Sequence, residues 1–297
     1  FRRVLFRSTG FSFAMPTAPL ASGYGWNTAQ FTTTGAVFIE KTAANHTWTG
    51  LNSGSWADTG NWEVGTLPSG TTDVFFAALT PNSATQIDGD KTVRNLFFSG
   101  DSNVTVGTGS GGVLYSNGSL FEVLGGTHSI SANLRPRATS GTTYHILNNG
   151  TLNFSNQILY HASSGTATLD LVFSGTGTTT VNALSRRVAS YDMNVVVNGP
   201  GTLVLTSSNL NAAPINQGDG ASGFITGTTT VTGGVLSLNS EANIGGNPAV
   251  FNPAHLTLSG GTLRARETFA IDDSNRGVTF GPGGATIEVE KIGRAHV

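Results

Sequence analysis

Three tryptophans close together are the residues of this chain best suited to contact a ligand. Trp48, Trp56 and Trp62 fall within fifteen residues, in the segment HTWTGLNSGSWADTGNW. Exposed indole faces can stack on sugar rings, which would make the cluster a glycan-contact site. Buried indoles would instead cover the end of a repeat array, where the first unit has no neighbour. The sequence alone leaves both interpretations open.

Several aspartates could be calcium ligands or the paired acids of a glycosidase: Asp88, Asp90, Asp219, Asp272 and Asp273. Each stands among Gly, Asn or Ser, which are the residues of tight turns. Calcium requires about six to eight oxygen ligands, and the GGxGxD pattern of calcium-binding β-rolls does not occur. The sequence therefore favours turn residues over a calcium or catalytic site.

Four arginines could serve a β-helical polysaccharide lyase, which uses clustered Asp with Arg or Lys in one groove: Arg135, Arg137, Arg186 and Arg187. No Asp cluster at the spacing of one coil accompanies them, so we expect residues of a solvated face or loop. GTGSGG (107–112) has the spacing of a dinucleotide-binding loop, but no helix-forming stretch follows it.

The histidines outside the two ends show no HExxH motif or shared spacing, and no G-x-S-x-G elbow is present. They are His46, His128, His145, His161 and His255. We therefore predict no catalytic residue, no metal site and no cofactor, and interpret the chain as a non-enzyme.

Composition limits the fold class and the partners. Gly accounts for 40 of the 297 residues, only 11% of residues are charged, and there is no Cys. Average proteins contain about 7% Gly and about 25% charged residues. The abundant Thr, Ser, Asn and Gly suit turns and half-buried strands rather than helices, which predicts an all-β chain. A formal net charge of −2 offers no basic surface for nucleic acid. No apolar run is long enough for a membrane-spanning helix.

From about Gly107 onward a cassette recurs, a Gly-containing turn followed by a strand with apolar residues at every second position. Its copies are GSGGVLYS (109–116), NNGTLNFS (148–155), GPGTLVLTS (199–207), TGGVLSLNS (232–240), SGGTLRARE (259–267) and GPGGATIEVE (281–290). The last four start 33, 27 and 22 residues apart, a period typical of repeats that stack to bury their apolar faces.

No helical period separates the cassettes, so they predict a right-handed parallel β-helix (β-solenoid). An antiparallel β-sandwich is the alternative, because short strands with Gly turns suit it as well. Antiparallel pairing between 232–240 and 259–267 would refute the solenoid.

Both ends of the chain differ from the rest. One set of codons for FRRVLFRS (1–8), read on the opposite strand, gives IGRAHV and a stop, so we interpret 1–8 and 291–297 as translated sequencing-adapter sequence. Residues 9–290 would then be an internal fragment, with 10 basic against 17 acidic residues. Within it we expect a linker or the tail of a preceding module (9–45), a Trp-rich capping module (46–106) and the solenoid repeats (107–290).

The cassettes resemble the autotransporter-associated β-strand repeat of long secreted bacterial proteins. The resemblance is carried by GTTTVTGGVLSLNSEANIG (227–245), GPGTLVLTSSN (199–209) and LTLSGGTLRA (256–265). The segment WTG…GSWADTGNW…LPSGTTDVFF resembles the one that often precedes such arrays. The resemblance implies a passenger-like β-helix, exported and displayed or released at the bacterial surface.

We therefore expect a structural or adhesive segment of a large secreted or surface-displayed bacterial protein. Its partners would be surface glycans or host and matrix surfaces, with no nucleic acid and no membrane-spanning segment. Two alternatives stay open: a β-helical polysaccharide lyase or hydrolase, and a glycan-binding module that uses the Trp cluster.

Overall fold

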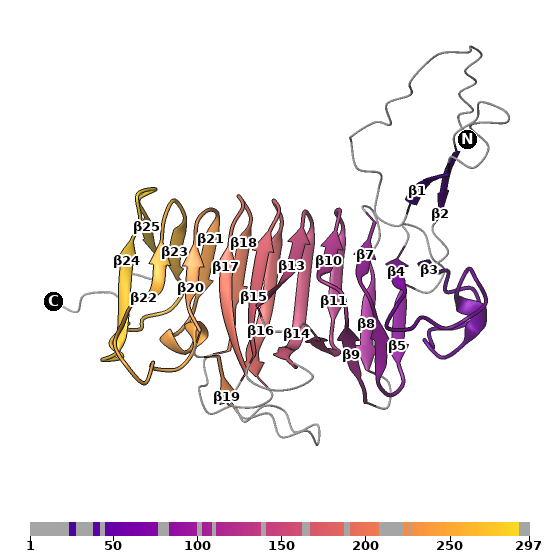
Figure 1. Cartoon of the computed structure of the whole chain (residues 1–297), viewed down its shortest axis with the longest axis horizontal. Helices are drawn as coiled ribbons and strands as arrows, with labels where there is room; N and C mark the ends of the chain where they lie inside the picture. Colours follow the sequence, from indigo (N-terminus) through magenta and orange to yellow (C-terminus); the bar gives the residue numbers. More distant parts are fainter. Residues whose placement is uncertain are drawn as a thin grey trace, which may run out of the picture.

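A computed structural model describes residues 24–27, 38–41, 45–76, 83–99, 103–108, 111–137, 141–161, 167–186, 191–207, 223–225 and 227–290. Its elements are strands apart from two short 3-10 helices, η1 (Thr59–Asn61) and η2 (Glu241–Ile244). Figure 1 shows the strands side by side in an elongated stack, which follows the order of the sequence from one end to the other. Each coil of the chain therefore lies on the coil before it.

The first long sheet has ten strands, all paired in parallel. In spatial order they are β3 (Asn45–Trp48), β4 (Asp73–Phe76), β7 (Leu96–Phe98), β10 (Leu120–Val123), β13 (Thr142–Asn148), β15 (Ala167–Ser174), β17 (Tyr191–Val197), β20 (Thr229–Val231), β22 (Asn252–Leu258) and β24 (Arg276–Phe280).

The second long sheet takes the next strand of each coil, again in parallel. Its path runs through β5 (Ala84–Ile87), β8 (Thr105–Thr108), β11 (Thr127–Ile130), β14 (Thr151–Tyr160), β16 (Thr178–Arg186), β18 (Thr202–Leu205), β21 (Val235–Leu238), β23 (Thr262–Ala265) and β25 (Thr286–Val289).

A third side is formed by β6 (Lys91–Val93), β9 (Val113–Ser116), β12 (Asn133–Pro136) and the later halves of β14 and β16. The register of β14 shifts between Phe154 and Gln157, so one strand serves both the second and the third side. The short strand β19 (Gly223–Phe224) pairs antiparallel with β16. A separate antiparallel pair joins β1 (Tyr24–Asn27) and β2 (Phe38–Lys41).

The predicted β-solenoid is confirmed, with about eight turns. The deciding pair is β21 with β23, which the sequence places in the segments 232–240 and 259–267. These strands are parallel, with Val235 opposite Thr262 and Leu238 opposite Ala265, which rules out the antiparallel sandwich. The parallel stack begins at β3, so it also includes strands from the segment expected to form the Trp-rich capping module.

The core is a set of apolar rows that run along the solenoid axis. Leu96 pairs with Phe121, and Phe121 with Ile146, so one coil here takes 25 residues. All three side chains are fully buried. Aromatic rings continue the rows, with centroids 4.7 Å apart for Phe76 and Phe98. Because burial of one large apolar side chain contributes about 1.5–3 kcal/mol, these rows supply most of the driving force for stacking.

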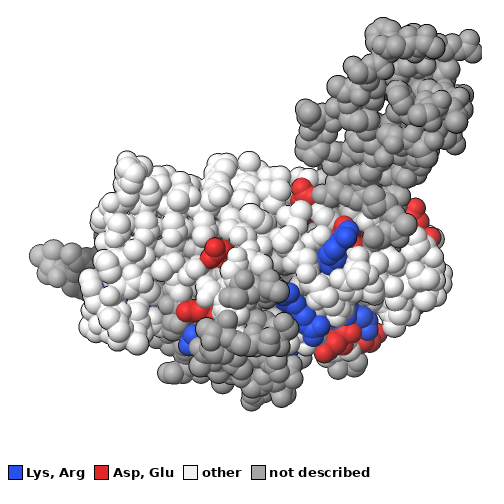
Figure 2. Space-filling view, in the orientation of Figure 1, with Lys and Arg blue, Asp and Glu red and all other residues white. Residues whose placement is uncertain are grey.

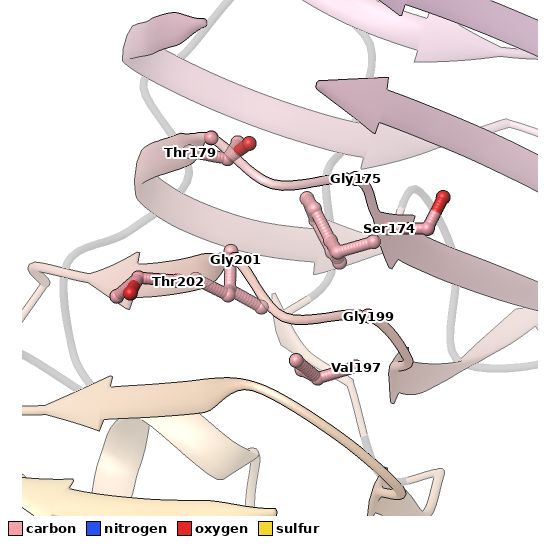
Figure 3. Close-up of a pocket in the computed structure, with 10 residues that line it drawn as sticks. Ser174, Gly175, Thr179, Val197, Gly199, Gly201 and Thr202 are labelled. Atoms are coloured by element: carbon pink, nitrogen blue, oxygen red, sulfur yellow. The ribbon is translucent and has the colours of Figure 1, made fainter. Parts of the chain in front are cut away.

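Glycines mark the corner between the first and second sheets, where coils approach most closely. A Cβ on Gly177 would lie 2.0 Å from the carbonyl oxygen of Gly150, and one on Gly201 would lie 2.4 Å from that of Gly177. The same corner carries backbone bonds such as Thr202 N–H to Gly177 O, 2.9 Å long. Figure 3 shows Gly175, Gly199 and Gly201 on neighbouring coils at this corner. Glycine at positions 150, 177 and 201 is therefore required by coil spacing.

We predict that Gly177→Ala lowers the free energy of unfolding by about 1–3 kcal/mol, because the new methyl group meets a backbone oxygen of the coil before it. Chemical denaturation monitored by circular dichroism measures the change. Gly107→Ala is the matched control, since a Cβ there meets its nearest atom, Ser131 Oγ, at 3.5 Å. Equal denaturation midpoints for the two variants would contradict the close approach.

Candidate functional site

The three tryptophans pack against one another at the first coil. The ring centroid of Trp62 lies 5.1 Å from that of Trp48 and 4.8 Å from that of Trp56, both edge to face. The indole N–H of Trp62 donates to the carbonyl oxygen of Trp56 at 3.0 Å. Trp56 in turn contacts Phe76, whose ring begins the aromatic row of the core. The cluster is therefore an extension of the solenoid interior.

A buried asparagine holds the loop that carries Trp56 and Trp62. Asn61 Oδ1 accepts from the backbone N–H groups of Asn52 and Ser53, and its Nδ2 donates to Ser53 Oγ and the carbonyl of Ser55. The loop is tied to β5 because Trp56 N–H donates to Gln86 O at 2.9 Å. With every polar atom of its side chain bonded, Asn61 fixes the loop over the first coil.

Burial bears directly on the glycan-contact interpretation of the cluster. The exposed fractions of Trp48, Trp56 and Trp62 are 0%, 1% and 2%. A sugar ring stacks on an open aromatic face, and none of these three indoles offers one in this arrangement. The position over the first coil is what the capping alternative requires.

The acids singled out in the sequence make local contacts. Asp88 accepts from Ser55 Oγ and Asp90 from the backbone N–H of Val113. Asp273 pairs with Arg276, and Asp219 lies outside the described residues. Among the residues that the structure describes, no three His, Asp or Glu side chains converge in a way that could hold a metal ion.

The arginines proposed for a lyase groove have different surroundings. Arg135 is buried, with Nη1 3.2 Å from the hydroxyl oxygen of Tyr115. Arg137 is exposed and stacks on the same ring, 3.6 Å from its centroid. Arg186, two coils further on, donates to the carbonyl of Tyr191. Arg187 lies outside the described residues. Tyr115 thus brings Arg135 and Arg137 together.

Charged side chains are sparse on the face of the molecule in Figure 2, and only some of the basic and acidic groups on it lie next to each other. Arg94 forms a two-pronged bond with Asp73 at 2.7 and 2.6 Å. This hydrogen bond raises the pKa of Arg94. The pattern agrees with a surface that has no strong electrostatic field on this side.

Arg276 is the buried charge that sequence reasoning missed. Its side chain is fully buried and donates to Glu241 at 2.9 Å and to Asp273 at 2.7 Å. It also bonds His255 and the carbonyls of Ile244 and Gly245. A buried guanidinium with this many partners links η2 to β22 and β24. In the sequence, only the three-residue spacing between Asp273 and Arg276 could have indicated this ion pair.

His128 is the second buried polar group that the sequence left without a role. Its Nδ1 accepts from the N–H of Val104 at 3.2 Å, and its Nε2 donates to the carbonyl of Gly125 at 2.9 Å. This arrangement requires the neutral ring, because a protonated Nδ1 could not accept. Burial lowers the pKa of His128. The ring also packs on Phe98, with centroids 4.8 Å apart.

Two pockets of the described region are small. One hollow of about 10 Å³ lies at the glycine corner drawn in Figure 3, between Ser174 and Gly201. Another of about 30 Å³ lies between Leu205 and Asn243. Such spaces suit about one water each, so neither fits a sugar or a nucleotide. In the part of the chain that the structure describes, no helix is long and apolar enough to cross a membrane.

Comparison of the chain with protein-family models, curated proteins and solved structures finds no match. The likeness to the autotransporter-associated repeat therefore remains a resemblance carried by the Gly-Thr-Leu cassettes, and the fold is the property that the structure shows.

We predict that Trp62→Ala lowers the free energy of unfolding by about 3–5 kcal/mol, because it empties the centre of the cap. Leu51→Ala in the same loop is the control, since Leu51 is exposed and its truncation should change little. Indole fluorescence of the wild-type protein should not respond to soluble glycans. A saturable fluorescence change that Trp62→Ala abolishes would restore the glycan-contact interpretation.

Stability should also depend on pH through His128. Its pKa in the folded state lies below that in the unfolded state, about 6.5. Its contribution is therefore complete above about pH 6.5 and is lost as pH falls towards the folded pKa, because the unfolded chain takes up the proton first.

The test is the free energy of unfolding measured between about pH 8 and pH 5. His128→Gln should flatten the decline at low pH relative to the wild type. An unchanged slope in His128→Gln would show that this ring does not titrate as described.

Proposed function

We propose that this chain is a structural segment of a large secreted or surface-displayed bacterial protein, in which the solenoid serves as an elongated stalk or display surface. The observation that carries the proposal is the unbroken parallel sheet from β3 to β24. Each coil contacts only its neighbours, so such a stack extends in one direction and presents long lateral faces. That geometry suits projection of a surface away from a cell.

The N-terminal cap supports the same role. Trp48, Trp56 and Trp62 close the first coil and protect the apolar rows behind them. A chain without Cys needs no disulfide chemistry to fold outside the cell. The resemblance of the cassettes to autotransporter-associated repeats points to export and to adhesion as the use of the lateral faces.

A lyase or hydrolase is less well supported by the geometry. Such an enzyme needs acids and a cation around one open groove, as in the paired-carboxylate mechanism of glycosidases. Asp273, one of the candidate acids, is instead bound to the buried Arg276. Arg135 lies buried beside Tyr115.

The proposal is tested in the bacterium that carries the gene. Antibodies raised against residues 46–290 should label intact cells or the culture medium, and external protease should remove the cell-bound signal. An antibody against a cytoplasmic protein is the control for cell integrity. Labelling only after permeabilisation would contradict surface display or secretion.

A further inference from the structure

The outer face of the second sheet carries a row of threonines, one from each of six coils out of seven. Strand pairing places the members of this row opposite one another. The row consists of Thr127, Thr151, Thr178, Thr202, Val235, Thr262 and Thr286. The register is continuous, so the hydroxyl groups form a line along the solenoid axis.

A second row, of mixed composition, lies two residues further along the same strands, and its side chains are exposed or half-exposed except that of Ser237, which is buried. It consists of Thr105, Ser129, Asn153, Thr180, Val204, Ser237, Arg264 and Glu288. Charges occur only in its last two members, which pair with each other at 2.9 Å. We call the two rows together the threonine face. Its part from β11 to β21 is free of charge.

The hydroxyls of the first row are available to solvent. Thr127, Thr151 and Thr178 are exposed, and Thr202 and Thr262 are half-exposed. The side chains between the two rows, such as Leu152 and Leu203, point inward and are buried, as period-two alternation requires. Within the described residues, no hydrogen bond engages a side-chain hydroxyl of the first row.

The two rows define a regular two-dimensional array. Neighbouring strands lie about 4.8 Å apart, and residues i and i+2 of one strand lie about 6.6 Å apart. Threonine is stiff at χ1, so the methyl and hydroxyl groups of the first row are restricted in orientation. An array of this kind matches a partner that is itself periodic in two dimensions and makes many weak, identical contacts.

We propose that the threonine face binds ice. Surface water molecules of ice repeat at spacings close to those of this array, and ordered hydroxyls and methyl groups can take places in such a lattice. A protein partner is a poor fit, because the two rows contain no aromatic residue and their arginine is already paired. A neutral polysaccharide is also less suited, since sugar sites rely on aromatic stacking.

Contacts elsewhere in the second sheet support a rigid, ordered threonine face. Further along the strands, Thr206 Oγ1 donates to Asn182 Oδ1, and Asn239 Nδ2 donates to Thr206 O. These bonds link successive coils at the edge of the threonine face and hold the rows in register. The first sheet has a shorter threonine row, in which Thr230, Thr257 and Thr279 follow His145, Val172 and Val196. The hydroxyls of Thr257 and Thr279 donate to the carbonyls of Ala254 and Pro253, so they are not free to order water as those of the first row of the threonine face are. Ice binding does not depend on export, so failure of the display proposal would leave the ice-binding proposal untouched, and the reverse also holds.

The test uses the whole chain, labelled at its N-terminus and frozen slowly onto a cold surface. Wild-type protein should be enriched in the growing ice and should inhibit ice recrystallisation. The double variant Thr151→Tyr/Thr178→Tyr places two bulky rings on exposed positions and should lose both effects. Thr230→Tyr/Thr257→Tyr makes the same change on neighbouring coils of the first sheet and should behave as the wild type.

Circular dichroism establishes that each protein is folded before freezing. Exclusion of folded wild-type protein from ice would overturn the proposal, as would undiminished enrichment of the Thr151→Tyr/Thr178→Tyr variant. A pull-down with insoluble cellulose distinguishes ice from a crystalline polysaccharide as the partner. Binding to cellulose that the same variant abolishes, without enrichment in ice, would assign the face to a neutral glucan instead.

Discussion

The stacking of each coil on the one before it, residue upon residue, is the constraint on which the rest of this structure depends. It requires glycine at the corner, since the backbones of Gly150, Gly177 and Gly201 pass too close for a side chain. It places apolar residues of successive coils in contact, so that burial accumulates along the axis. The same register orders the outer surface, where Thr178 and Thr202 lie side by side. Core, corner and threonine face are three consequences of one spacing.

The sequence predicted the fold class because the cassettes combine a Gly turn with strict alternation. Leu236 and Leu238 are buried as the pattern requires. Alternation alone is the same in parallel and antiparallel sheets, so the prediction of parallel pairing depended on the recurrence of the cassettes, and the structure confirms it. The early coils escaped detection, because β4 and β7 are short and their outward residues Phe75 and Phe97 are also apolar. Alternation is lost when both faces of a strand carry aromatic side chains.

The candidate sites were less predictable than the fold. Burial of Trp62 depends on how residues 49–72 fold over the first coil, and no periodic pattern encodes that loop. His128 is a polar residue that follows a Gly-containing turn, so nothing in the sequence indicated its burial. In the structure its side chain points inward, between the outward Thr127 and Ser129. In the sequence, the threonine face could be recognised only as polar residues that alternate with apolar ones along each strand. Its alignment across coils depends on insertions, since Thr178 and Thr202 are 24 residues apart and Thr202 and Val235 are 33 apart.

Register is therefore the property to measure most directly. The chain has no Cys, so a disulfide can form only between introduced residues. Thr178→Cys/Thr202→Cys joins in-register neighbours, whose Cα atoms lie about 4.8 Å apart, within the range of a disulfide. Thr180→Cys/Thr202→Cys is displaced by two residues and lies beyond that range. The parallel solenoid predicts efficient oxidation of the first pair and little of the second. Preferential oxidation of the displaced pair would contradict the stacking on which core, corner and threonine face all depend.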